Sequence, residues 1–231
     1  MGSIDTFRSG QVSGQGRYPS GVGIMTSGIP EVITLALADL NGAKVFVESG
    51  TYLGATTRWA SRHFERVFTI ERAPSLYEQH SAELRRLDGV TPLLGDSRDV
   101  LPSVINEIGP RRAVYWLDGH WSGGPTAGED DECPLLGELS CLAGRQDDIV
   151  LIDDARLFLS SPPRPHKAES WPTIDEVIRA LGLGGREPFI QVCEDVIFAV
   201  PNREPVRGYL RDYARSRSQA FWESFSRLQR A

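Results

Sequence analysis

The chain has little cysteine, no long apolar segment and no excess of positive charge. Its three cysteines, Cys133, Cys141 and Cys193, are too few and too scattered for a disulfide framework or a zinc site. No apolar run approaches the roughly 18 residues of a membrane span, and the polar N-terminus does not resemble a signal peptide. We therefore expect a cytoplasmic protein that has no membrane partner.

Basic surface is also scarce. The formal net charge is −6, and no basic face is evident before the C-terminal tail. Nucleic acids attract proteins through clustered lysine and arginine, so a nucleic-acid partner is disfavoured.

Alternating apolar and helix-compatible segments organise most of the 231 residues. Length and composition suit a single α/β domain. Strands are predicted at 44–48, 66–71, 90–94, 113–117 and 148–152, helices at 31–40, 74–87, 97–108 and 171–181, and a closing hairpin at 189–193 and 196–200. This alternation predicts a doubly wound α/β sheet.

The two ends of the chain differ from its middle. Residues 1–29 are predicted to be a flexible N-terminal segment that can act as a lid, and 30–204 the main domain. Residues 205–231 combine arginines with aromatic residues, which predicts a helical tail that packs on the domain or on a second subunit. A homodimer is therefore one expectation.

The stretch Val47–Gly54 is the most informative part of the sequence. It follows one apolar run and precedes a helix-compatible segment and a second apolar run, which ends on Glu71. Strand, glycine turn, helix, strand and terminal acid form the layout of a nucleotide-binding unit, in which the acid accepts hydrogen bonds from ribose hydroxyls. The dinucleotide spacing G-x-G-x-x-G is absent, which disfavours a dehydrogenase.

The motif Glu48-x-Gly50-x-x-x-Gly54-x-Thr56 resembles that of class I S-adenosylmethionine (SAM) methyltransferases. The resemblance implies a Rossmann-like seven-stranded sheet with the last strand antiparallel and helices on both faces. It also implies a SAM site made by Glu48, Gly50, Thr51, Tyr52, Gly54 and Thr56 at the methionine, Glu71 at the ribose, and Asp96 and Ser97 at the adenine. Aspartate and serine are also favoured helix N-caps, and both interpretations of Asp96-Ser97 can hold.

Three acids follow two neighbouring predicted strands: Asp118 after 113–117, and Asp153 and Asp154 after 148–152. Ligands bind at such strand ends in open α/β sheets. Converging carboxylates raise one another's pKa unless a cation neutralises them, and an all-oxygen set suits Mg²⁺.

The same acids are similar to those of the metal-dependent catechol-type and antibiotic-sugar (macrocin-type) O-methyltransferases. That resemblance implies that Asp118, Asp153 and Asp154 hold Mg²⁺ or another divalent cation. On a simpler interpretation, Asp153 and Asp154 are only polar residues where the strand passes into a loop, and Asp118 contacts SAM alone.

His120 and the loop after it complete the predicted site. His120 lies two positions after Asp118 and is a candidate general base, because histidine titrates near neutrality. It could instead bond the cofactor or pack on a neighbour. The loop 122–132 is a candidate lid, and its acidic run Glu129–Glu132 is either solvated or supplies a metal ligand or selects a cationic substrate.

These features predict a SAM-dependent, metal-assisted O-methyltransferase that acts on a hydroxyl of a small metabolite such as a sugar or natural product. One alternative is a metal-independent N- or O-methyltransferase. A second is a non-catalytic SAM-binding module, which would not need the acids at positions 153 and 154.

Overall fold

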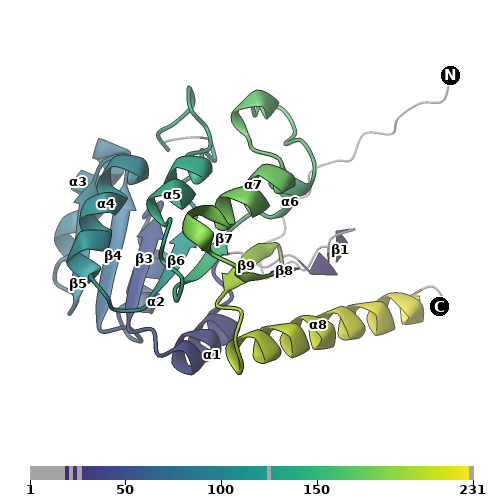
Figure 1. The fold of residues 1–231 in the computed structure, drawn as a ribbon. Helices are drawn as coiled ribbons and strands as arrows, with labels where there is room; N and C mark the ends of the chain where they lie inside the picture. The colour runs from purple at the N-terminus through teal and green to yellow at the C-terminus, as the bar shows by residue number, and fades with distance from the viewer. Residues whose placement is uncertain (1–18, 21–22, 25–27, 124–125, 229–231) are drawn as a thin grey trace, which may run out of the picture.

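Seven strands form one mixed sheet at the centre of the molecule (Figure 1). The computed structural model describes residues 19–20, 23–24, 28–123 and 126–228. The sheet order is β5-β4-β3-β6-β7-β9-β8, with bounds β3 (Val45–Ser49), β4 (Arg66–Glu71), β5 (Val90–Leu94), β6 (Ala113–Leu117), β7 (Ile149–Ile152), β8 (Phe189–Cys193) and β9 (Val196–Val200). β9 runs antiparallel to both β7 and β8, while the other neighbouring strands are parallel. The predicted Rossmann-like sheet with an antiparallel last strand is confirmed.

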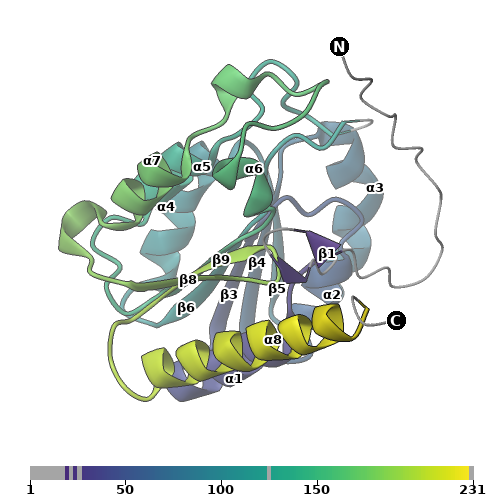
Figure 2. The same ribbon diagram turned by 90° about the vertical axis from the view of Figure 1, so that its right-hand side faces the viewer.

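Helices cover both faces of this sheet (Figures 1 and 2). One buried cluster joins the sheet to α1 (Glu31–Asn41), α2 (Ala55–Ala60), α3 (Pro74–Leu84) and α8 (Val206–Leu228). A second joins its other face to α4 (Ser97–Ile108), α5 (Leu135–Cys141), α6 (Arg156–Leu159) and α7 (Ile174–Leu181). Short 3₁₀ turns occur at η1 (Ala168–Ser170) and η2 (Leu183–Gly185).

The central strands are buried on both faces, and this explains their near-continuous apolar sequences. Along β3, Phe46 packs in the first cluster whereas Val45 and Val47 pack in the second. Along β6, Trp116 and Tyr115 divide in the same way. The alternation is the two-residue period of a strand, and it fixes which side chains point to each face.

The strand order reverses between β3 and β6. From β3 the chain adds β4 and β5 on one side, and it then returns to place β6 on the other side. Ser49 and Leu117, the last residues of β3 and β6, are paired in register. The segments after these residues therefore leave the sheet side by side, at the point where open α/β sheets bind ligands.

The ends of the chain add one long helix and one short pair of strands. In α8, Val206 and Leu210 are buried in the core, whereas Tyr209 is 40% exposed. The strands β1 (Pro19–Ser20) and β2 (Gly23–Ile24), which the sequence did not predict, pair antiparallel. Most of the predicted N-terminal lid lies outside the described residues, and the division into 1–29, 30–204 and 205–231 stays a prediction. Within the described part of the chain, no helix is long and apolar enough to cross a membrane.

Candidate functional site

A cavity of about 340 Å³ opens where the strand order reverses. Gly50 after β3, Glu71 at the end of β4, Asp96 and Ser97 after β5, and Asp118 after β6 all line it. Tyr52 and His120 also contribute, and residues of the loop after His120 form one wall. Seven of the predicted site residues therefore meet around one space of small-molecule size.

Gly50 makes the close approach of two strand ends possible. Its φ is 87°, in the left-handed region that favours glycine. A Cβ atom at this position would lie 2.2 Å from the carbonyl oxygen of Asp118. Any side chain would push the turn after β3 away from the segment after β6 and would deform the cavity.

Glu71 is held by two backbone amides at the end of β4. Its Oε2 accepts a hydrogen bond from Tyr52 N at 2.9 Å, and its Oε1 accepts one from Ala73 N at 2.8 Å. Both bonds fix the carboxylate at the cavity wall, and the remaining lone pairs can accept hydrogen bonds from a ligand's hydroxyls.

Asp96 has both of the roles that the sequence allows. It caps α4 by accepting from Arg98 N at 3.0 Å, and it also lines the cavity. The Arg98 guanidinium, which donates to both of its carboxylate oxygens, lowers the pKa of Asp96 despite partial burial. Arg72 also lies 3.4 Å from this carboxylate, so Asp96 is a fixed anion.

Four residues predicted to touch the cofactor lie behind the cavity wall. They are Glu48, Thr51, Gly54 and Thr56, none of which lines the cavity. The buried Glu48 carboxylate accepts hydrogen bonds from Thr57 at 2.5 Å and Thr69 at 2.7 Å. Burial raises the pKa of Glu48 to about 7, although hydroxyl donors oppose the shift. Glu48 thus supports the turn from beneath.

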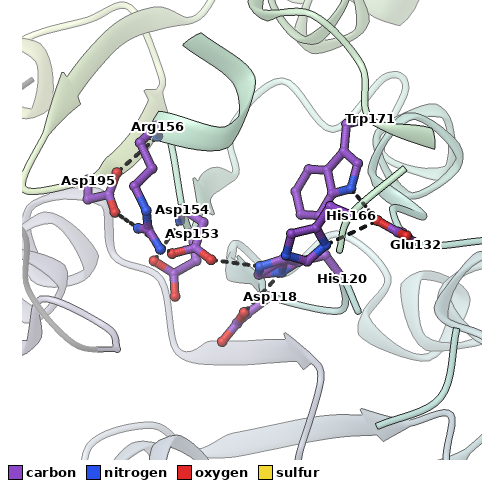
Figure 3. Close-up of polar contacts among 9 residues, drawn as sticks. All are labelled: Asp118, His120, Glu132, Asp153, Asp154, Arg156, His166, Trp171 and Asp195. Carbon is purple, nitrogen blue, oxygen red and sulfur yellow. Dashed lines mark hydrogen bonds and ion pairs between the residues drawn. The ribbon is translucent and has the colours of Figure 1, made fainter. Parts of the chain in front are cut away.

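His120 lies between two of the predicted acids (Figure 3). Its Nε2 is 2.8 Å from Asp154 Oδ2, and its Nδ1 is 3.3 Å from Asp118 Oδ1. Burial lowers the pKa of His120, although the Asp154 carboxylate opposes the shift. Both ring nitrogens therefore already face carboxylates.

Arg156, at the start of α6, holds the second of these acids. Its Nη1 donates to Asp154 Oδ1 at 2.6 Å and also contacts the buried Asp195 in the β8–β9 turn. Asp154 has a φ of 54°, a conformation that aspartate tolerates better than most residues. Arg156 and His120 together occupy the two oxygens of Asp154.

The predicted metal set is not assembled in this arrangement. Among the described residues, no three His, Cys, Asp or Glu side chains are placed to hold a metal ion. Burial and then the charges of Asp153 and Asp154 raise the pKa of Asp118 well above its ordinary value. Burial and the charge of Asp154 raise the pKa of Asp153 to about 7. Arg156 pairs directly with Asp154, and its charge offsets only part of the rise in the pKa of Asp153.

The acidic run Glu129–Glu132 divides into two parts. Glu129 and Asp130 are exposed, as expected of a solvated loop. Asp131 forms an ion pair with Arg98 at 2.5 Å, which joins the loop to the cavity wall. Glu132 is buried, so this end of the run belongs to the interior rather than to solvent.

Glu132 accepts hydrogen bonds from three groups of one later segment. Trp171 Nε1 lies at 2.8 Å, the Lys167 amide at 3.0 Å and His166 Nδ1 at 3.1 Å. Burial acts to raise the pKa of Glu132, but these donors outweigh it and hold the pKa below its ordinary value. Sequence reasoning missed His166, Trp171 and Arg156 as members of the site, and it considered Glu132 only as part of the acidic run.

The comparisons with known proteins found similar structures only. No family model and no curated protein matches the chain. The O-methyltransferase TomG from Streptomyces achromogenes, solved with SAM, is 22% identical over 78% of this chain and 82% of its own, with a TM-score of 0.48. The putative methyltransferase SMU.1697c from Streptococcus mutans, solved with SAH, is 11% identical over 74% of this chain and 98% of its own, with a TM-score of 0.47. An rRNA methylase from Streptococcus thermophilus is 11% identical over 74% and 94%, with a TM-score of 0.42. At this level of identity and TM-score, the likenesses do not assign a reaction to this chain.

Proposed function

We propose that this protein is a SAM-dependent methyltransferase that acts on a hydroxyl of a small molecule. One observation carries the proposal: the cavity at the strand reversal is lined by Gly50, Glu71, Asp96 and Asp118. These positions belong to the motifs whose pattern resembles the SAM-binding segments of class I methyltransferases. We infer a hydroxyl as the acceptor because Asp118, Asp153 and Asp154, which follow β6 and β7, resemble the corresponding acids of O-methyltransferases.

The residues present fit SAM by their chemistry. Glu71 would accept hydrogen bonds from the ribose hydroxyls, and Ser97 and Asp96 would contact the adenine. Asp118, 32% exposed, lines the same cavity on the side of β6, away from Asp96 after β5, and a positive amino or sulfonium group there would favour its ionised form. SAM supplies a methyl group that its sulfonium has already activated. The chain's own part is therefore to hold the reactants in line and to exclude water.

Metal assistance is a more specific prediction than methyl transfer itself, and one observation favours it. Burial and neighbouring carboxylates raise the pKa of both Asp118 and Asp153, and a bound cation would relieve this repulsion. The third acid, Asp154, is engaged by Arg156 and His120, which does not fit a three-carboxylate set. We therefore take metal-independent transfer as the main proposal and metal assistance as the second candidate.

Titration calorimetry with SAM, SAH and NAD⁺ tests the proposal. We expect SAM and SAH to bind and NAD⁺ not to bind, because the dinucleotide glycine spacing is absent. Binding of NAD⁺ without SAH would overturn the proposal. Binding of SAH without transfer from trideuteromethyl-SAM to any acceptor would favour the non-catalytic binding module.

A further inference from the structure

A second cavity, of about 430 Å³, adjoins the proposed cofactor cavity. His120 and Ser122 line both spaces, so these two residues mark their junction. Asp118 follows β6 and the adenine-side residue Asp96 follows β5, and these strands lie three places apart in the sheet, so His120 lies on the Asp118 side of the first cavity. A molecule in the second cavity would thus approach the sulfonium end of SAM rather than the adenine end.

His166 lines this second cavity and is fixed from behind by Glu132 (Figure 3). The hydrogen bond joins His166 Nδ1 to Glu132 Oε2, and in the neutral ring this places the proton on Nδ1 and the lone pair on Nε2. Within the described part of the chain, no hydrogen bond is seen at Nε2, and 18% of the His166 side chain is exposed. A carboxylate that orients an imidazole in this way is a common arrangement for a base.

The indole of Trp171 holds the two imidazoles of the site near each other. Its ring centroid lies 5.3 Å from that of His166 and 5.2 Å from that of His120. Trp171 is itself fixed by its hydrogen bond to Glu132. His166 is therefore placed firmly beside the junction of the two cavities, and its Nε2 differs from both nitrogens of His120, which already face carboxylates.

The charges around the second cavity indicate what kind of molecule it takes. Arg156 is the one lysine or arginine among the described lining residues, and Asp154 and Asp195 already compensate it. A carboxylate or phosphate would find no unshared cation there. Ser122, Ser160 and Ser161 instead offer hydroxyls, and Trp121 offers an aromatic wall. These groups suit a neutral, hydroxylated ring.

We propose that the second cavity is the acceptor site, that it selects uncharged hydroxylated molecules over anionic ones, and that His166 is the catalytic base. The inference rests on the proposed methyl transfer. The acceptor O–H bond breaks and its proton passes to His166 Nε2. The new O–CH₃ bond forms as the S–CH₃ bond breaks, and its electron pair stays on sulfur. Glu132 is a positioning residue that keeps Nε2 as the acceptor nitrogen.

Two matched pairs of probes test the site: methyl glucoside with methyl glucuronide, and resorcinol with a dihydroxybenzoate. Each pair differs by one carboxylate. Binding is measured by saturation-transfer NMR with SAH present, and transfer from trideuteromethyl-SAM by mass spectrometry. We expect at least one neutral probe to bind and to be methylated, and its anionic partner to bind at least about tenfold more weakly.

Variants of His166 separate chemistry from packing. His166→Gln and His166→Phe, the second of which keeps a ring beside Trp121 and Trp171, should each lower transfer about 100-fold or more. SAH affinity should stay within about twofold. The matched control is His63→Gln, an exposed histidine outside both cavities, which should transfer at the wild-type rate. In Glu132→Gln, ring-nitrogen NMR should show a changed His166 tautomer, together with slower transfer.

The outcomes separate the two proposals. Failure of the wild type to bind SAH would overturn the methyltransferase proposal itself. SAH binding without binding or methylation of any neutral probe would overturn the acceptor site, and so would preference for the anionic partners. Wild-type transfer rates in either folded His166 variant would overturn the role of His166.

Discussion

The backbone amide of Tyr52 donates to the Glu71 carboxylate at 2.9 Å, and this bond ties the turn after β3 to the end of β4. The predicted ribose acid is therefore also a support for the glycine turn. A variant of Glu71 will change both the binding group and the shape of the turn. The loss of ligand binding can be measured apart from the change in the turn only if the replacement side chain keeps an oxygen that accepts from the backbone amides.

Glu71→Gln keeps such an oxygen, so we expect it to fold normally and to bind SAH more weakly. A charge-assisted hydrogen bond to a hydroxyl contributes about 1.5–3 kcal/mol, which corresponds to roughly 10- to 100-fold in affinity. Calorimetry with SAH measures the loss, and Glu83→Gln, an exposed acid on α3, is the control. Equal SAH affinity in the two folded variants would remove Glu71 from the ribose site.

Glu48 should make stability fall as the pH rises. Its pKa is about 7 in the folded protein and about 4.5 when unfolded, so the folded state binds the extra proton between these values. Ionising the buried acid then lowers the free energy of unfolding, by up to about 3 kcal/mol once the pH is above the folded pKa. Denaturant unfolding of Glu48→Gln across this pH window should show a smaller decrease of the unfolding free energy with rising pH than the wild type shows. The same decrease in both proteins would contradict the assignment.

The fold was predictable because its signals are local. Strands buried on both faces have nearly continuous apolar sequences, which can be recognised without the structure. The predicted bounds coincide with the observed ones for β4, β5, β6, β8 and β9. The glycine turn after β3 and Asp118 after β6 meet at the reversal of strand order, whereas Asp153 and Asp154 follow the next strand, β7, and do not line that cavity. The two-residue period also explains Glu48, which lies on the same side of β3 as Phe46 and so points beneath α2.

The second half of the site was not predictable, because its contacts join distant loops. Glu132 meets His166 and Trp171 across more than thirty positions, and neither loop has a repeating pattern. Arg156 follows Asp154 in a short helix, and nothing local reveals that it also reaches Asp195. Such contacts depend on how loops pack over the sheet, which periodicity does not encode.

Leu210 should contribute strongly to the free energy of unfolding, so the helical tail is better tested by point variants than by truncation. The side chain is fully buried in the core shared by α1, α8 and the sheet, so removing the segment after Asn202 would remove part of the core. Leu210→Ala should cost about 2–5 kcal/mol in unfolding free energy, while the neighbouring Tyr209→Ala should cost less than about 1 kcal/mol. Chemical denaturation of both variants measures the difference. Similar losses would show that α8 does not pack as described.

Chelation should leave methyl transfer largely unchanged. Asp154, the acid that would complete a magnesium site, has Arg156 on one oxygen and His120 on the other. Binding a cation there would leave the Arg156 charge without one of its two partners.

We expect transfer in EDTA to stay within about twofold of the untreated rate, and calorimetry to show no saturable Mg²⁺ binding below about millimolar concentration. Asp153→Asn serves as the matched variant, because it removes one of the two acids whose pKa is raised and leaves Asp154 in place. Loss of turnover in EDTA that Mg²⁺ restores, together with Mg²⁺ binding that Asp153→Asn abolishes, would contradict this expectation. Those two results would assign the acids after β6 and β7 to a metal.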